Sequence, residues 1–157
     1  MKIPKNIKMV ITDFDGIFTD NSVIIDDDGR ISRRVSFKDV MGVSILVKNG
    51  YKVGIVSGEE NMAIKLIAKK FNLEDVYMNI RIKIDILHKI LERNGLSRDE
   101  VLYIGDDIND EECLKYVNTR ITVPNANKRI KNIDGIQITS AAGGDGAFRE
   151  IVDEIIG

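Results

Sequence analysis

The sequence predicts an α/β fold in which helices cover a doubly wound parallel sheet. Short apolar, β-branched runs are typical of buried strands, and the apolar residues between them recur at spacings of three and four, as in amphipathic helices. Because strands and helices alternate, a parallel sheet with right-handed crossovers is favoured. The strands are expected near residues 8–13, 52–57, 76–78, 101–105, 119–123 and 136–139.

Two helices are indicated most clearly by their apolar faces. The first follows Glu59, and the second ends near Asn94 and Gly95. In each, apolar side chains recur at helical spacing, which predicts an apolar face along the helix. These side chains are Met62, Ala63, Leu66, Ile67 and Phe71 in the first helix, and Ile82, Ile86, Leu87, Ile90 and Leu91 in the second.

One segment interrupts the alternation of strands and helices. Residues 23–25 and 31–37 read as two short strands joined by an Asp-Gly turn, which predicts a β-hairpin insertion after the first strand, at about residues 22–37. The three aspartates at 26–28 invite comparison with a calcium loop. Their spacing lacks the further ligands and the closing glutamate of an EF-hand, so a turn is favoured.

Asp13 and Asp15, which follow the first expected strand, are the most informative residues of the chain. Alternate residues of an extended chain point the same way, so both carboxylates leave the strand together, and Gly16 lets the backbone turn beside them. Two carboxylates this close repel each other unless they share a proton or bind a cation. Mg²⁺ prefers oxygen ligands and is the natural partner. Taken alone, the motif equally fits a solvated acidic turn.

A second acidic cluster, at residues 106–110, directly follows the strand expected at 101–105. Open α/β sheets bind ligands at the carboxyl ends of their strands. If the two strands are neighbours, Asp13, Asp15 and Asp106 converge on one cation, with Asp110 in reach as further support.

Two segments that could bind an anion lie between the acidic clusters. Ser57 and Gly58 follow the strand at 52–57 and offer a hydroxyl group and free N–H groups at the start of a helix, an arrangement that suits an anion. Lys83 lies in the first turn of the second amphipathic helix and supplies a positive charge.

The composition narrows the class of protein. A chain of 157 residues, 43% of them hydrophobic, is most simply one domain, 1–157, with a sizeable core. A net charge of −2 gives no reason to expect a nucleic-acid or membrane partner. No apolar stretch is long enough to span a membrane, and no signal segment precedes the first strand. The single cysteine, Cys113, excludes an internal disulfide and favours a cytoplasmic location.

The ordered set of motifs resembles the haloacid dehalogenase superfamily of phosphohydrolases. The set comprises DFDG, Ser-Gly after a strand, a lysine, and GDDIND, and it spans residues 13–110. The further segments SFKDVMG, VSGE and GGDGAFRE are similar to the capless branch of that superfamily, which includes 3-deoxy-D-manno-octulosonate 8-phosphate phosphatase and nonulosonate 9-phosphate phosphatases. The resemblance implies a Rossmann-like sheet, magnesium as cofactor and a sugar-acid phosphate as substrate.

The resemblance also implies a role for each matching residue. Asp13 would be the nucleophile that forms an aspartyl-phosphate, and Asp15 the general acid and then the base that activates water. Ser57, Gly58 and Lys83 would hold the transferring phosphoryl group. The implied metal ligands are the Asp13 carboxylate, the Asp15 main-chain oxygen and Asp106, supported by Asp107 and Asp110.

Departures from the family pattern leave the substrate open between the two branches. Glu59 stands where octulosonate phosphatases commonly have arginine, and a glutamate there is more similar to the nonulosonate branch. Glu59, Lys70 and Arg149 are the candidates for binding the sugar acid. The overall likeness slightly favours the eight-carbon substrate.

The sequence disfavours two functions other than phosphatase. A signalling receiver domain is disfavoured, because Ser57 precedes the GDD cluster and no isolated aspartate ends the second strand. A catalytically silent oligomerisation module, like that attached to some acylneuraminate cytidylyltransferases, is disfavoured by the intact set of motif residues. The resemblance further implies a homotetramer in which the hairpins of four copies pack together.

Overall fold

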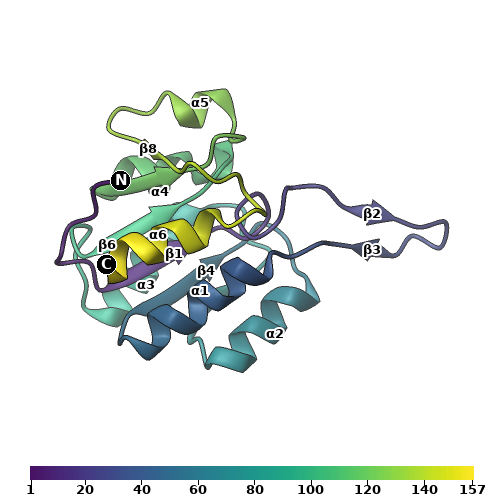
Figure 1. Ribbon diagram of the computed structural model, residues 1–157, viewed down its shortest axis with the longest axis horizontal. Helices are drawn as coiled ribbons and strands as arrows, with labels where there is room; N and C mark the ends of the chain where they lie inside the picture. The colour runs from purple at the N-terminus through teal and green to yellow at the C-terminus, as the bar shows by residue number, and fades with distance from the viewer.

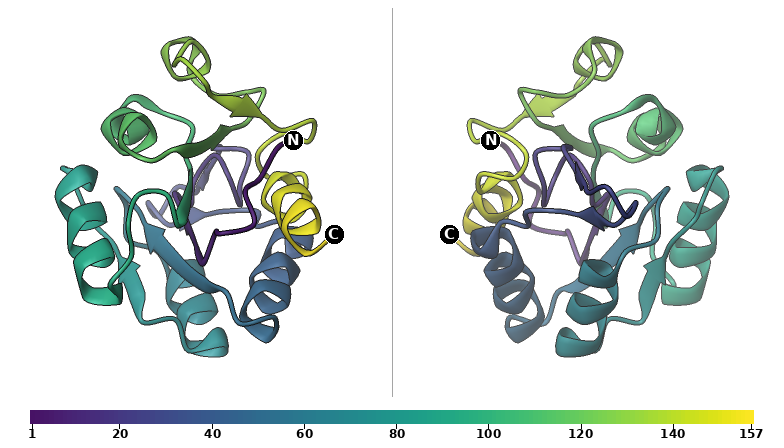
Figure 2. Two further views of the ribbon diagram at one scale, coloured as in Figure 1. Left: turned by 90° about the vertical axis from the view of Figure 1, so that its left-hand side faces the viewer. Right: turned by 90° about the vertical axis from the view of Figure 1, so that its right-hand side faces the viewer.

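Six parallel strands form a central sheet with helices on both faces (Figures 1 and 2). The computed structural model describes residues 1–157. All six strands expected from the sequence are present. The strand expected at 76–78 keeps its length but begins one residue earlier, and the other five are one or two residues shorter than predicted. The six strands are β1 (Met9–Thr12), β4 (Lys52–Val56), β5 (Asp75–Tyr77), β6 (Val101–Ile104), β7 (Thr119–Thr122) and β8 (Gln137–Ile138), in the sheet order β5-β4-β1-β6-β7-β8.

Between β1 and β6 the chain changes the side of the sheet on which it adds strands, although all six strands stay parallel. β1 pairs in parallel with β4 on one side and with β6 on the other, so the chain builds one half of the sheet before it returns to build the second. Thr12 lies opposite Ile104, and the main-chain N–H of Asp13 donates to the carbonyl oxygen of Ile104 at 3.0 Å. The carboxyl ends of β1 and β6 are therefore adjacent at the position where open α/β sheets bind ligands.

The helices lie in two layers, one on each face of the sheet (Figure 2). Strand residues alternate between the layers, since Val10 packs in the core beneath α1, α2 and α6, and Met9 and Ile11 pack in the core beneath α3, α4 and α5. The helices are α1 (Phe37–Lys48), α2 (Met62–Phe71), α3 (Lys83–Asn94), α4 (Glu111–Tyr116), α5 (Lys128–Lys131) and α6 (Ala147–Ile156). None of them is long and apolar enough to cross a membrane.

The hairpin insertion is present and projects away from the sheet (Figure 1), but the prediction that its second strand reaches residue 37 was wrong. Strand β2 (Ile24–Ile25) pairs with β3 (Ile31–Ser32), and Phe37 is the first residue of α1. Ser36 ends the extended segment because its hydroxyl accepts the N–H of Asp39 and so caps the helix.

Asp39 connects the first helix to the last. Its buried carboxylate accepts the main-chain N–H groups of Gly146, at 3.2 Å, and Arg149, at 2.9 Å, and so caps α6 from α1. Gly42 permits close packing of the same pair of helices, because a Cβ atom there would lie 3.1 Å from the ring of Phe148. The C-terminal helix is thus held against the half of the sheet that contains β1.

Candidate active site

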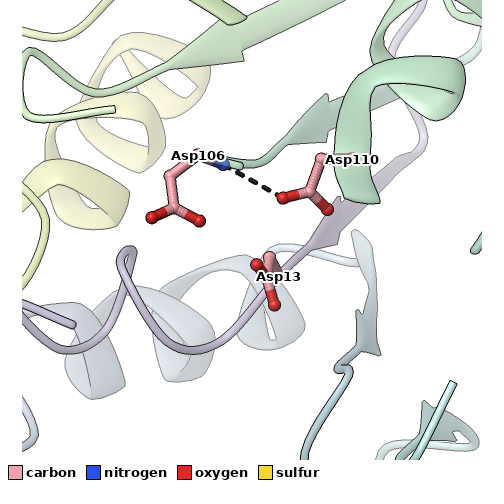
Figure 3. Close-up of side chains that lie close together, drawn as sticks. All are labelled: Asp13, Asp106 and Asp110. Carbon is pink, nitrogen blue, oxygen red and sulfur yellow. Dashed lines mark hydrogen bonds between the residues drawn. The ribbon is translucent and has the colours of Figure 1, made fainter. Parts of the chain in front are cut away.

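The two acidic motifs meet in the structure, with Asp110 in the cluster of carboxylates where the sequence placed Asp15. The carboxylates of Asp13, Asp106 and Asp110 point toward one another at the adjacent ends of β1 and β6 (Figure 3), and an oxygen atom from each lies within 4.8 Å of the others. All three side chains are buried. Lys83 approaches from the start of α3, with its Nζ 3.0 Å from Asp13 and 2.8 Å from Asp110. One ammonium group therefore faces three carboxyl groups.

Asp110 is saturated by hydrogen bonds from the protein. Its Oδ1 accepts from Lys83 Nζ and from the Tyr103 hydroxyl at 2.8 Å, and its Oδ2 accepts the main-chain N–H groups of Asp106 at 3.1 Å and Asp107 at 3.3 Å. These four donors occupy the lone pairs that a carboxylate offers. Asp110 thus orients Lys83 and the loop after β6, and its oxygens are not free to bind a ligand directly.

The pKa values of the cluster reflect its burial and its crowded charge. Burial, followed by the nearby charge of Asp110, raises the pKa of Asp13 well above its usual range, against the opposing effect of Lys83. The same two causes raise the pKa of Asp106 to about 7. Burial alone would lower the pKa of Lys83, but the carboxylates of Asp110 and Asp13 outweigh it and raise that pKa above its usual value. The cluster carries more negative charge than Lys83 neutralises.

The free oxygen atoms at the site suit a divalent cation. Asp13 Oδ1 is engaged by Lys83 and by the Phe14 N–H, whereas its Oδ2 accepts no hydrogen bond from an N–H or lysine donor. The main-chain oxygen of Asp15, which lies two residues after Asp13 in the same loop, accepts no hydrogen bond. Together with Asp106 these groups form the hard, all-oxygen donor set that Mg²⁺ prefers. Excess negative charge and unused oxygens therefore both fit the ion implied by the sequence.

Ser57 and Gly58 follow β4 and face the cluster. The hydroxyl of Ser57 accepts the N–H of Glu59 at 3.2 Å, and the Ser57 carbonyl accepts the N–H of Ile80 at 3.0 Å, which fixes the loop. The expectation that these residues begin a helix was wrong, since α2 starts at Met62. The helix starts late because the side chain of Asn61 caps it.

A solvent-accessible cavity of about 620 Å³ opens over these groups. Seven of the predicted site residues contribute to its lining, and five further residues were not anticipated. Among these five is Arg81, the one cationic residue in the lining, whose side chain makes no hydrogen bond or ion pair. The lining consists of Asp13, Asp15, Asn21, Ser57, Gly58, Glu59, Ile80, Arg81, Asp106, Asp107, Ile108 and Asn109.

Asp15 is held by two side chains at the mouth of the cavity. Arg33 Nε lies 3.0 Å from its Oδ1 and 3.1 Å from its Oδ2, and the hydroxyl of Thr19 donates to Oδ1 at 3.1 Å. Arg33 was not predicted as a site residue, because it lies 18 positions from Asp15 along the chain, on the hairpin just after β3, and no local pattern indicates the contact.

Lys70 and Arg149 do not line the cavity in a single chain. Lys70 lies on α2 with its ammonium group over the rings of Phe37 and Phe71, at 5.8 and 5.6 Å. Arg149 lies on α6 and pairs with Asp153 at 2.7 Å. Their predicted contact with substrate stays a prediction for an assembled protein.

Glycines bring the backbone close to the acidic cluster. Gly16 has a φ of +87°, and a Cβ atom there would lie 1.8 Å from Asp106 Oδ2. The segment at 143–144 packs behind the same loop: a Cβ atom on Gly143 would lie 1.7 Å from the Gly16 carbonyl oxygen, and Gly144 N–H donates to Ile17 at 2.9 Å. This glycine-rich segment therefore supports the loop after β1 of its own chain.

Comparison with known proteins identifies the family. Residues 79–151 match the haloacid dehalogenase-like hydrolase family. A putative HAD family hydrolase from Streptomyces avermitilis is 35% identical and superposes with a TM-score of 0.90, over 98% of this chain and 87% of that chain. The chain belongs to the haloacid dehalogenase-like hydrolase family.

Other relatives within this family carry more specific names. The 3-deoxy-D-manno-octulosonate 8-phosphate phosphatase KdsC of Haemophilus influenzae is 28% identical, over 97% of this chain and 84% of that protein. The corresponding phosphatase of Moraxella catarrhalis, solved with a magnesium ion, phosphate and KDO, is 26% identical with a TM-score of 0.90, over 97% of this chain and 87% of that chain.

Proposed function

We propose that this protein is a magnesium-dependent phosphatase that hydrolyses a sugar-acid phosphate, 3-deoxy-D-manno-octulosonate 8-phosphate, in the cytoplasm, and that residues 1–157 act as one catalytic domain. The observation that carries the proposal is the buried cluster of Asp13, Asp106 and Lys83 beneath an open cavity. The names of the relatives from Haemophilus influenzae and Moraxella catarrhalis support this substrate.

In the proposed reaction Asp13 attacks phosphorus and forms an aspartyl-phosphate, while Asp15 protonates the leaving sugar oxygen. Asp15 then removes a proton from the water that hydrolyses the intermediate, a type of assistance worth about 10²–10⁴-fold. Lys83, Ser57 and the Gly58 N–H hold the phosphoryl oxygens. The Asp13 carboxylate, the Asp15 main-chain oxygen and Asp106 would hold a magnesium ion, which would supply positive charge to offset the repulsion between these carboxylates and the phosphate.

A panel of sugar phosphates tests this function directly. Release of inorganic phosphate should be fastest, by kcat/KM, from the eight-carbon sugar-acid phosphate. Glu59 lines the cavity and can accept hydrogen bonds from an N-acyl amide, which favours a nonulosonate 9-phosphate as the second candidate. Comparing the two acids in wild type and in Glu59→Arg separates them. No turnover of either acid would contradict the proposed substrate class.

The carboxylate of the sugar acid requires a cation apart from the phosphate site, and Arg81 meets this need. We expect Arg81→Met to raise KM for the sugar-acid phosphate about 10- to 100-fold, the usual effect of losing a hydrogen bond to a charged group. Turnover of p-nitrophenyl phosphate, which has no carboxylate, should stay within about twofold of the wild-type rate, so the loss should be confined to the sugar-acid phosphate.

Arg98→Met provides the matched control for Arg81→Met. Arg98 precedes β6 and so lies at the amino ends of the strands, whereas the cavity opens at their carboxyl ends. Its guanidinium group lies 6.0 Å from the ring of Tyr116. An equal rise in KM for both substrates in Arg81→Met would contradict a role in recognising the carboxylate.

We also propose a homotetramer in which the hairpins of four copies pack together. Ile24, Ile25 and Ile31 are 71, 65 and 56% exposed on a hairpin that projects from the sheet (Figure 1). An isolated two-stranded hairpin is marginal in water, so such a surface calls for a partner. In the proposal Lys70 contacts the sugar acid from the helix that borders the substrate entrance, and Arg149 reaches the site of a neighbouring copy.

Light scattering measures the assembly. We expect a tetramer for the wild type, and smaller species for Ile25→Asp, because a buried unpaired carboxylate is costly. A monomeric wild type with full activity at assay concentration would contradict the proposal.

A further inference from the structure

The contact between Arg33 and Asp15 is unusual in its position. Both side chains are mostly shielded from solvent, at 14 and 19% exposure, and Arg33 Nε lies within 3.1 Å of both carboxylate oxygens. A charge-assisted hydrogen bond in such surroundings is stronger than an exposed ion pair. Thr19 adds a second donor, and its own hydroxyl also accepts the main-chain N–H of Gly16 at 3.2 Å.

This contact is also how the hairpin is linked to the sheet. Among residues 23–35, Arg33 alone makes a hydrogen bond or ion pair with a residue outside the hairpin. The other arginine with polar partners there, Arg30, binds Asp26 and Asp28 at the hairpin tip, both at 2.8 Å. The polar link between hairpin and core thus ends on one carboxylate, that of Asp15.

We propose that Arg33 is a positioning residue that fixes the carboxylate of Asp15 for proton transfer, so that the hairpin forms part of the catalytic apparatus. This inference rests on the proposed phosphatase function. A free aspartate on a loop samples several rotamers, and a displacement of about 1 Å in a reacting group costs on the order of 10²-fold in rate. Arg33 and Thr19 together restrict that freedom before substrate arrives.

The kinetic consequence is a loss in kcat without a matching loss in binding. We expect Arg33→Met to lower kcat about 10- to 100-fold, within the range of acid–base assistance, and to change KM for the sugar phosphate less than about threefold. Arg33→Lys keeps the charge but not the planar guanidinium group, so it should recover part of kcat. Arg30→Met is the matched control on the same hairpin and should retain wild-type kcat.

A double-mutant cycle distinguishes positioning of Asp15 from a general structural role. In an Asp15→Asn background, Arg33→Met should lower kcat no further, because the carboxylate that it positions is already absent. Light scattering on each variant reports whether the assembly is intact. Additive losses in the cycle, or unchanged kcat in Arg33→Met beside an active wild type, would overturn this inference alone. A wild type that releases no phosphate from any sugar phosphate would overturn the proposed function instead.

Discussion

Asp13→Asn is expected to abolish phosphate release while leaving the fold intact. The amide has nearly the volume of the carboxylate, so packing at the end of β1 is preserved, but it is a poor nucleophile and a weak metal ligand. Removal of a nucleophile that acts together with its neighbours costs on the order of 10⁴–10⁶-fold in kcat. The variant should also unfold at the same temperature or higher, since one of three crowded carboxyl groups is replaced by a neutral group.

Single-turnover phosphate release and thermal unfolding measure the two effects in Asp13→Asn. Asp27→Asn, at the exposed hairpin tip, is the control for an Asp-to-Asn change far from the cluster. Near-normal turnover in Asp13→Asn with added Mg²⁺ would refute the covalent mechanism. A lowered unfolding temperature would contradict the view that the cluster carries excess negative charge.

Removal of divalent cations is expected to eliminate activity completely and reversibly. Asp13 and Asp106 repel an incoming phosphate, and Lys83 alone does not offset them because it is already shared between Asp13 and Asp110. Dialysis against a chelator should therefore abolish phosphate release, and Mg²⁺ should restore it. Full activity after exhaustive chelation would contradict the proposed cofactor.

The same ion should stabilise the folded protein. A ligand that binds only the native state adds about 2.7 kcal/mol at a concentration 100 times its Kd, so the unfolding temperature should rise with Mg²⁺ in the wild type and not in Asp106→Asn. Binding requires Asp106 to lose its proton. Because its pKa is raised to about 7, affinity for Mg²⁺ should weaken as the pH falls below that value. An equal rise in unfolding temperature with Mg²⁺ in the wild type and in Asp106→Asn would contradict binding at this cluster.

The sequence predicted the sheet and the acidic cluster because both depend on local patterns. Each strand is a short apolar run, and Asp13 and Asp106 directly follow two of these runs, so adjacency of the strands was enough to bring the carboxylates together. The hydrogen bonds that saturate Asp110 depend on rotamers and loop geometry, and no pattern in the sequence indicates them.

The features that the sequence did not predict depend on contacts between distant segments. Arg33 reaches Asp15 only after the hairpin has folded back, and Arg81 lines the cavity because the loop before α3 packs against Ser57. The start of α1 was missed although Ser36 and Asp39 carry a local capping signal, since the β-branched residues before them extend the strand pattern. Tertiary contacts thus decide what local preference leaves open.

The packing of Gly143 and Gly144 behind the loop after β1 has a consequence for biosynthesis. The ribosome releases the loop that contains Asp13 early, but the backing of this loop, including the N–H that Gly144 donates to Ile17, leaves the exit tunnel only after all six strands of the sheet have been synthesised. Contacts of such long sequence separation form late, because the entropy of closing the intervening chain must first be overcome. A nascent chain therefore holds Asp13 and Asp15 in an unsupported loop until Gly143 and Gly144 have emerged, and competence for catalysis arises only after that point.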